Sequence, residues 1–170
     1  FDIFLYANSN LQNIEIPLSI KTIAPFAVKY CDNLHDVTIS PNSNLQLIDN
    51  DAFNHSYIHN IYIPSQVVKI GKRAFQSCPN LNIEFSHYSK LEIIEKYAFN
   101  NSCFTSINIP STVIEIKKFA FQNCKIQNIN FQNDSKLAHI GKFAFSYTKM
   151  NEILIPPKVT KTKIGNFSKA

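Results

Sequence analysis

The sequence predicts a single α/β solenoid, with a parallel β-sheet on one face and short 3₁₀ or irregular turns on the other. Three observations lead to this prediction. A pattern I-x-x-x-A-F recurs along the chain, a strand-like pattern precedes most of its copies, and whole stretches of sequence return almost unchanged. The stretch Asn60–Cys78 comes back as Ser106–Cys124, 46 residues later, with every apolar position kept. Self-similarity at a fixed period is typical of repeat architectures.

The I-x-x-x-A-F pattern defines the repeat unit. Its isoleucines follow one another at steps of 25, 22, 24, 22 and 24 residues, so units of two lengths alternate and the chain holds six to seven repeats of 22–25 residues. The copies are Ile23–Ala27–Val28, Ile48–Ala52–Phe53, Ile70–Ala74–Phe75, Ile94–Ala98–Phe99, Ile116–Ala120–Phe121 and Ile140–Ala144–Phe145. One unit cannot bury its apolar side alone, so we expect the units to stack and the phenylalanines to form a buried column.

Alternating apolar residues predict the strands. An apolar residue followed by x-x-I-x-I has the period of two that marks a half-buried strand. The copies are Leu11–Ile14–Ile16, Leu34–Val37–Ile39, Ile58–Ile61–Ile63, Leu81–Ile83–Phe85 (one residue short), Phe104–Ile107–Ile109, Ile126–Ile129–Phe131 and Met150–Ile153–Ile155. We expect these strands to pair in parallel as one sheet, roughly 30 Å long at a spacing of about 4.8 Å.

The two unit lengths differ in the segment after the strand. In the shorter units a proline ends the strand, because proline has no N–H for the ladder; these are Pro17, Pro64, Pro110 and Pro156. In the longer units this segment is rich in Ser and Asn, with Ser43, Ser89 and Ser135 spaced 46 residues apart, which is a loop composition.

The full unit L-x-x-I-x-I-P-x-x-V-x-x-I-x-x-x-A-F-x-x-C resembles the BspA-like, or Treponema pallidum-type, leucine-rich repeat. Ile58–Cys78 and Phe104–Cys124 are the clearest matches, and the resemblance extends from Leu11 to about Pro157. It implies a leucine-rich-repeat solenoid of a surface-protein family, whose members adhere to host proteins, matrix or other cells. It implies no catalytic residue.

The whole chain, 1–170, is expected to form one solenoid. Residues 1–10 correspond to a truncated repeat, 11–157 to repeats and 158–170 to a degenerate last repeat, in which Thr162 stands where an isoleucine is expected. The chain lacks an initiating Met and shows no capping module. These features indicate a piece of a longer protein.

Composition and motifs argue against an enzyme. The chain is 45% hydrophobic and 17% charged, with a net charge of +5, as in a globular protein that tolerates an anionic partner. It contains no Gly-rich phosphate loop, no G-x-S-x-G and no H-E-x-x-H, so we expect neither catalytic residues nor a cofactor. It has no run of 18 apolar residues and therefore no expected membrane span.

Cysteines and histidines recur with the repeat but suggest no metal site. Cys31, Cys78 and Cys124 lie two units apart, beyond disulfide reach, and are expected to be buried thiols, although Cys103 leaves a pairing with Cys78 or Cys124 open. His35 and His59 share a strand position and should be neighbours, without a third ligand.

The outward-facing strand residues are the first candidate site. They form two polar columns, of which Asn60, Tyr62, Glu84, Asn108, Asn128 and Asn130 are the candidates for binding a protein or glycan ligand. The alternative is a solvated face with Asn side chains bonded to each other in ladders.

A second candidate is a basic stripe formed by Lys72, Arg73, Lys96, Lys118 and Lys142, suited to a polyanion such as a sulfated glycan or, alternatively, only to solubility. Nucleic acid is not expected, since the aromatic residues are interpreted as core.

Four N-x-S/T sequons, at Asn54, Asn100, Asn133 and Asn166, are candidate glycosylation sites and fit an extracellular protein. Together with the resemblance, they favour non-enzymatic recognition at a cell surface, with host cell surface or extracellular matrix as partner. The alternatives are a cytoplasmic protein–protein interaction scaffold and a structural spacer.

Overall fold

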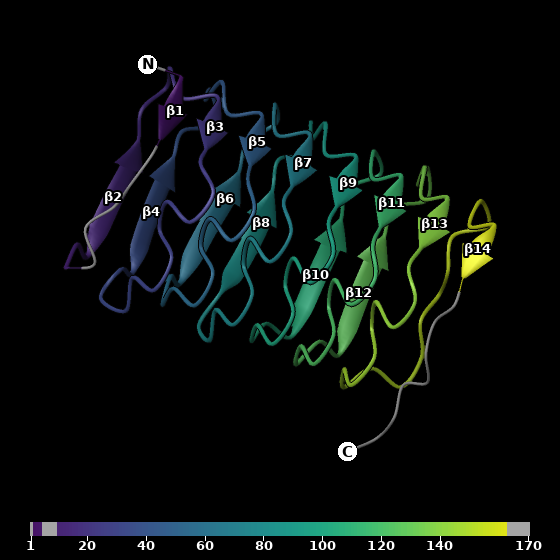
Figure 1. Ribbon diagram of the computed structural model, residues 1–170. Coiled ribbons are helices and arrows are strands. Elements are labelled where there is room, and N and C mark those ends of the chain that lie inside the picture. Colours follow the sequence, from purple (N-terminus) through teal and green to yellow (C-terminus); the bar gives the residue numbers. More distant parts are fainter. Residues whose placement is uncertain (1, 5–9, 163–170) are drawn as a thin grey trace.

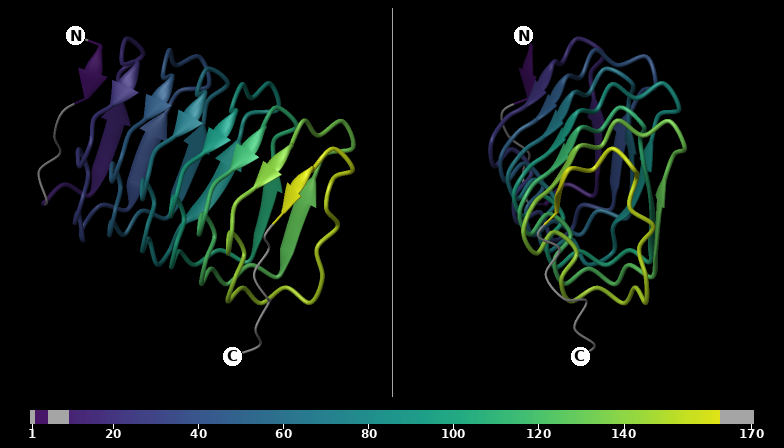
Figure 2. Two further views of the ribbon diagram at one scale, coloured as in Figure 1. Left: turned by 45° about the vertical axis from the view of Figure 1, so that its right-hand side comes forward. Right: turned by 90° about the vertical axis from the view of Figure 1, so that its right-hand side faces the viewer.

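The structure, a computed structural model of the chain, describes residues 2–4 and 10–162. The chain winds into a solenoid of stacked coils, and six of the described coils pass through a long strand, a corner, a short strand and a turn segment (Figure 1). Seen along the solenoid axis, the coils superimpose as closed loops, with the two kinds of strand on different sides (Figure 2). The predicted parallel β-solenoid is confirmed.

The long strands have four residues each. They are β2 (Asn13–Ile16), β4 (Asp36–Ile39), β6 (Asn60–Ile63), β8 (Asn82–Phe85), β10 (Ser106–Ile109) and β12 (Asn128–Phe131). The short strands have two residues each. They are β1 (Ile3–Phe4), β3 (Thr22–Ile23), β5 (Leu47–Ile48), β7 (Lys69–Ile70), β9 (Ile93–Ile94), β11 (Glu115–Ile116), β13 (His139–Ile140) and β14 (Lys161–Thr162).

The short strands form the longer sheet, which the sequence did not predict. All eight pair in parallel in the order β1-β3-β5-β7-β9-β11-β13-β14. The isoleucine of each I-x-x-x-A-F copy lies in this sheet, as in the register pair Ile70 and Ile94. Thr162 pairs with Ile140, so it occupies the isoleucine position as counted from the sequence.

The turn segments contain no helix, so the predicted α/β class and 3₁₀ turns are not confirmed for residues 2–4 and 10–162. Two residues per turn segment have positive φ, such as Asp51 (57°) and His55 (59°), and interrupt any helical run. In the turn segments from Asp51 to Asn123, the N–H groups at these positions and at the Phe between them donate to the next coil, as from Phe53 to the carbonyl of Ala74 (2.8 Å). The turn segments are therefore held by hydrogen bonds between coils.

The predicted phenylalanine column is confirmed. Phe53, Phe75, Phe99, Phe121 and Phe145 are fully buried, and their rings stack face to face at centroid distances of 5.1–5.4 Å. The alanine before each Phe is also fully buried, because the chain of the next coil passes close by at this position. Together with the inward residues of the strands, this column makes one continuous core along the solenoid.

Corner length decides whether neighbouring long strands pair. The short corners have three residues, as in Pro64–Gln66, and the long corners have five, as in Ser86–Lys90. Pairing is complete across each short-corner coil, that is between β2 and β4, β6 and β8, and β10 and β12. Across a long-corner coil, β4 and β6 share one register pair, Asp36 and Asn60, and no pairing links β8 to β10 in this part of the chain.

The long-strand sheet is therefore broken, which corrects the prediction of one sheet. It consists of β2-β4-β6-β8 and, separately, β10-β12. The coil after β12 also has a long corner, and the predicted strand over Met150–Ile155 does not form. We call two places the open junctions: β8–β10, where no pairing is described, and β4–β6, where pairing is reduced to one register pair.

Candidate functional site

The outward residues of the long strands form the polar face that the sequence predicts. Asn60, Glu84, Asn108, Asn128 and Asn130 are exposed, and Tyr62 is half-buried. They lie in register across the paired strands, as Tyr62 does with Glu84 and Asn108 with Asn130. We call this surface the strand face.

Asparagine pairs link neighbouring strands of the strand face where strand pairing is complete. We call these places the closed junctions. Asn82 Nδ2 donates to Asn60 Oδ1 (3.1 Å) across β6 and β8, and Asn130 Nδ2 donates to Asn108 Oδ1 (2.8 Å) across β10 and β12. The ladder proposed as the alternative from the sequence is thus present, but only as separate pairs within closed junctions of the described strands.

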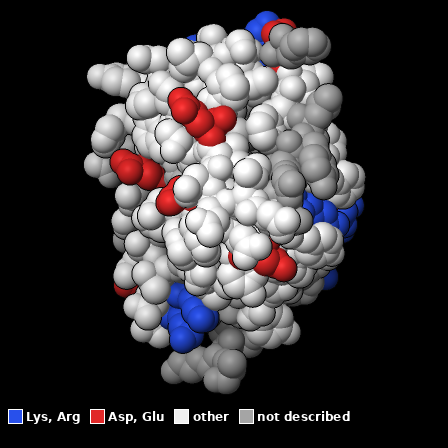
Figure 3. Space-filling view, turned by 90° about the vertical axis from the view of Figure 1, so that its left-hand side faces the viewer, with Lys and Arg blue, Asp and Glu red and all other residues white. Residues whose placement is uncertain are grey.

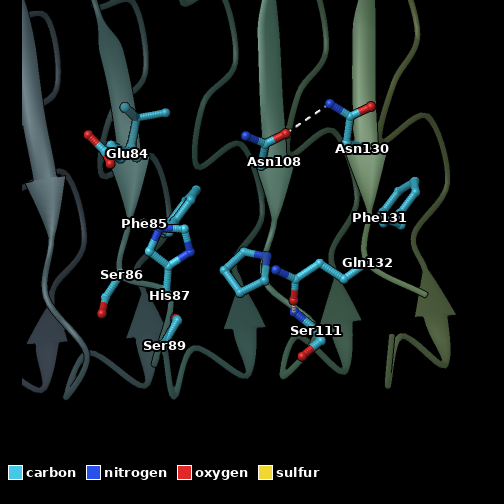
Figure 4. Close-up of a pocket in the computed structure, with 12 residues that line it drawn as sticks. Glu84, Phe85, Ser86, His87, Ser89, Asn108, Ser111, Asn130, Phe131 and Gln132 are labelled. Carbon is cyan, nitrogen blue, oxygen red and sulfur yellow. Dashed lines mark hydrogen bonds between the residues drawn. The ribbon is translucent and has the colours of Figure 1, made fainter. Parts of the chain in front are cut away.

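A hollow of about 300 Å³ lies at the open junction between β8 and β10. Glu84 and His87 line it on the β8 side, and Asn108 and Asn130 line it on the other (Figure 4). Gln132 Oε1 accepts a hydrogen bond from the Ser111 N–H (2.9 Å), which fixes the end of the hollow near the corners. The hollow offers carboxylate, imidazole and amide groups beside the partly buried rings of Phe85 and Phe131.

A second, more open hollow of about 520 Å³ lies at the open junction between β4 and β6. Asn13, Asp36 and Thr38 line it on one side, and Asn60 and Tyr62 on the other. Both hollows fall where a long corner interrupts strand pairing. Five of the six predicted strand-face residues line one of them, while Asn128 lies outside both.

The basic stripe is divided by its ion pairs. Arg73 donates from Nε and Nη2 to both carboxylate oxygens of buried Asp51 (2.9 and 2.8 Å), so its charge is neutralised within the protein. Lys117, beside the stripe, pairs with Glu95 at 2.8 Å. Lys72, Lys96, Lys118 and Lys142 take part in none of the ion pairs recorded for the described residues.

Hydrogen bonds outweigh burial at both carboxylates of these pairs. Burial by itself would raise the pKa of Asp51, but hydrogen bonds from Arg73 and Asn54 lower it below its ordinary value. Burial would likewise raise the pKa of Glu95, and hydrogen bonds from Lys117 and Lys69 lower it. Both carboxylates are thus held ionised as structural groups. They lie on the side of the solenoid formed by the turn segments, which we call the turn side.

Sequence reasoning missed a second aromatic column beside the lysines. Tyr97, Phe119 and Phe143 each follow a lysine of the stripe, are half-buried, and have φ values of 61°, 62° and 61°. Their rings stack at centroid distances of 4.9 and 5.6 Å. The signal was present as an aromatic residue directly before the Ala of three consecutive A-F pairs.

The sequons differ in accessibility. Asn54 and Asn100 are only 4% and 6% exposed, and their amide nitrogens donate to Asp51 and to Gln122 respectively. The folded protein therefore hides these two acceptors. Asn133 is exposed in a long corner, and Asn166 lies outside the described residues.

The cysteines and histidines take the places expected of them. All four cysteines are free thiols, and Cys78 Sγ donates to the carbonyl of Phe53 (3.1 Å). His35 and His59 stack with centroids 5.0 Å apart. Within residues 2–4 and 10–162, no group of three or more His, Cys, Asp and Glu could hold a metal ion.

Charge is spread thinly over the end of the solenoid formed by β1 and β2. Viewed from this end, acidic and basic side chains lie in separate small spots on a largely uncharged surface (Figure 3). In the part of the chain that the structure describes, no helix is long and apolar enough to cross a membrane.

Comparison with known proteins identifies the repeat. The model of the BspA type leucine rich repeat region matches in six copies, over residues 2–82 and 81–170. The chain belongs to this family. No curated protein matches it. Leucine-rich-repeat solenoids of this kind are typically non-catalytic.

Solved structures share the fold of this BspA-type solenoid. A leucine-rich repeat protein from Bacteroides ovatus superimposes with a TM-score of 0.66 at 26% identity, over 88% of this chain and 44% of that one. The pneumococcal vaccine antigen PcpA gives 0.69 at 20% identity, over 87% and 51%. A leucine rich cell surface protein from Faecalibacterium prausnitzii gives 0.55 at 22% identity, over 88% and 43%. The chain spans about half the length of these proteins.

Proposed function

We propose that this BspA-type solenoid is a non-enzymatic recognition module of a cell-surface protein, which binds a protein or glycan at the open junctions of its strand face. The observation that carries the proposal is that both hollows lie at the open junctions, where long-strand pairing is absent (β8–β10) or reduced to one register pair (β4–β6). A fully paired sheet would present a flat row of side chains, whereas each interruption lets a ligand reach the sides of the strands.

The side chains at the hollows suit hydroxyl-rich or peptide ligands. The β8–β10 hollow has neutral amides at Asn108 and Asn130, a carboxylate at Glu84 and an imidazole at His87. These groups supply both donors and acceptors, as sugar hydroxyls and peptide groups require. At the β4–β6 hollow, Tyr62 adds apolar ring surface with a hydroxyl at its tip, which is the character of residues that dominate binding energy.

The backbone beneath the hollows is pre-ordered. Ser86 and Ser89, in the corner next to the β8–β10 hollow, are buried, and their hydroxyl oxygens accept hydrogen bonds from the N–H groups of Tyr88 (3.2 Å) and Leu91 (3.1 Å). A rigid site loses less conformational entropy when a ligand binds. We expect the extracellular matrix or a host cell surface to provide the ligand, in keeping with the cell-surface character of the Faecalibacterium protein.

A matched pair of quadruple variants tests the proposal. The first replaces Asn60, Tyr62, Glu84 and Asn108 of the strand face with alanine. The control replaces with alanine Asn33, Tyr57, Glu92 and Asn80, which are exposed, chemically equivalent, off the long strands and not at the positive-φ positions. Binding is measured to arrayed glycans and matrix proteins and to whole cells, after both variants have been shown to unfold like the wild type.

The strand-face variant should lose at least about tenfold in affinity, and the control less than about twofold. Equal effects, or none, would mean that the strand face does not bind. If the wild type adheres to nothing in any of these assays, this part of the protein is a spacer.

A further inference from the structure

The turn side carries a straight column of four lysines from four successive coils, Lys72, Lys96, Lys118 and Lys142. Each carbonyl oxygen accepts a hydrogen bond from a backbone N–H of the preceding coil. These bonds run from Asp51 to Lys72 (2.8 Å), Arg73 to Lys96 (3.2 Å), Tyr97 to Lys118 (3.3 Å) and Phe119 to Lys142 (3.3 Å). The lysine backbones are thus fixed at one coil spacing, so the column is about 15 Å long at about 5 Å per coil.

The column keeps its positive charge. The nearby carboxylates are already occupied, since Asp51 pairs with Arg73, and Glu95 pairs with both Lys69 (3.2 Å) and Lys117 (2.8 Å). Glu95 therefore balances only one of the two lysines that contact it. This side of the solenoid has a surplus of positive charge along a line.

The aromatic column of Tyr97, Phe119 and Phe143 restrains the side chains of two of these lysines. The ammonium of Lys96 lies over the rings of Tyr97 and Phe119, 5.0 and 5.7 Å from their centroids, and that of Lys142 lies 4.6 Å from the centroid of Phe143. Such contacts restrain an otherwise mobile side chain. Binding an anion then costs less side-chain entropy than it would for free surface lysines.

We propose that this lysine column is a second binding site, separate from the strand face, for a linear sulfated glycan. A rod of regularly spaced anionic groups matches a straight row of regularly spaced cations. Single-stranded nucleic acid needs open ring faces on which its bases can stack. Here Tyr97, Phe119 and Phe143 stack on one another at 4.9 and 5.6 Å, so each buries ring surface against its neighbour. An anionic membrane would favour a plane of charge with apolar side chains projecting from it, whereas these rings are half-buried.

The test uses heparin oligosaccharides as the probe, with chemically desulfated heparin, poly-dT and phosphatidylserine vesicles in parallel. The first variant changes Lys72, Lys96, Lys118 and Lys142 to Gln. A control changes Lys90, Lys125, Lys136 and Lys149 to Gln, which removes the same charge from exposed lysines elsewhere. A third variant changes the column lysines to Arg and keeps both charge and ring contacts. Unfolding curves establish that all three are folded.

The column Gln variant should bind heparin at least about tenfold more weakly, with a shallower dependence on salt, because fewer counterions are released. The control should change by less than about twofold, the Arg variant should bind like the wild type, and desulfation should abolish binding. The strand-face quadruple variant should keep heparin binding, so the two sites are tested independently.

Four results would overturn the proposal. The first is a wild type that does not bind heparin, and the second is a control that loses as much affinity as the column variant, which would indicate bulk charge. The third is a strand-face variant that loses heparin binding too. The fourth is binding of poly-dT or vesicles as tight as that of heparin through the same lysines, which would make the ligand a nucleic acid or a membrane.

Discussion

Phe99 stacks on Phe121 of the next coil, with ring centroids 5.1 Å apart and ring planes within 8° of parallel. Phe104 meets both rings edge-on, at 88° and 87°. Phe99 thus contacts aromatic rings on three sides, including Phe75 in the preceding coil. Each coil buries its phenylalanine only because its neighbours are in place, so the stability of this solenoid is shared between coils.

Replacing Phe99 with alanine should destabilise the protein by about 3–5 kcal/mol, because it removes a fully buried ring and leaves a cavity in the middle of the column. The measurement is the free energy of unfolding in denaturant. Tyr88→Ala is the matched control, since Tyr88 is 86% exposed and its loss should change stability by less than about 0.5 kcal/mol. A cost below about 1 kcal/mol for Phe99→Ala would show that the column is not the core.

Stability should fall in acid through Asp51 and Glu95. Both carboxyls have a pKa below the ordinary value in the folded protein, so they stabilise the fold above the ordinary pKa values of 3.8 and 4.5. This contribution is lost as pH falls through the lower, folded-state values. The free energy of unfolding should be nearly constant from about pH 7 to pH 5 and then decline below about pH 4.5.

Asp51→Asn tests which group is responsible for the acid effect. The variant should be less stable than the wild type at neutral pH, because the ion pair with Arg73 is lost, and should decline less between pH 5 and 3. An unchanged decline would exclude Asp51 as a source of the acid sensitivity.

The cysteines should be free but unequal in reactivity. Burial raises the pKa of Cys78 to about 12 and also raises that of Cys124, whose Sγ donates to the carbonyl of Phe99 at 2.9 Å. Cys103 is half-buried. A thiol reagent at pH 8 should therefore label Cys103 in the native protein, and Cys78 and Cys124 only after unfolding. Non-reduced mass spectrometry should find four thiols. Equal labelling rates, or a disulfide, would contradict the buried-thiol interpretation.

Much of the fold could be predicted because the same pattern of apolar residues recurs in each repeat. The Phe column and the adjacency of His35 and His59 follow from counting residues, since equivalent positions of stacked units must coincide in space. The recurrence of Ser43, Ser89 and Ser135 was also evident, but their burial was not predicted from a loop composition. The strand-face residues followed from a period of two. These predictions required only that equivalent residues of successive repeats occupy the same position in each coil.

Other features could not be predicted because they depend on backbone geometry between coils. The second row of strands has only two residues per coil, too few for an alternation to be recognised. Positive φ at Tyr97, Phe119 and Phe143 turns their rings outward beside the lysines, whereas an aromatic residue next to a buried pattern suggests core. Asn54 and Asn100 were expected at the surface, but a turn segment with hydrogen bonds to the next coil buries them.

The proposed function requires that the long corners open the strand face and thereby create the binding sites. The most direct test replaces the five-residue corner Ser86–Lys90 with Pro-Ser-Gln, the sequence of the short corner Pro64–Gln66. The coil between β8 and β10 then has 22 residues instead of 24, as in the coil between β6 and β8, whose strands pair fully. A control replaces Ser86–Lys90 with Ser-Pro-Asn-Ser-Asn, the sequence of the long corner Ser40–Asn44, which removes His87 but keeps the length.

The measurement is the affinity of both variants for the ligand that the strand-face assay identifies. The short-corner variant should close the β8–β10 hollow and lose at least about tenfold in affinity, although Glu84, Asn108 and Asn130 remain. The long-corner control loses the His87 contact as the short-corner variant does but keeps the hollow open, so it should bind more weakly than the wild type and clearly more tightly than the short-corner variant. A short-corner variant that is folded and binds as tightly as the wild type would contradict the claim.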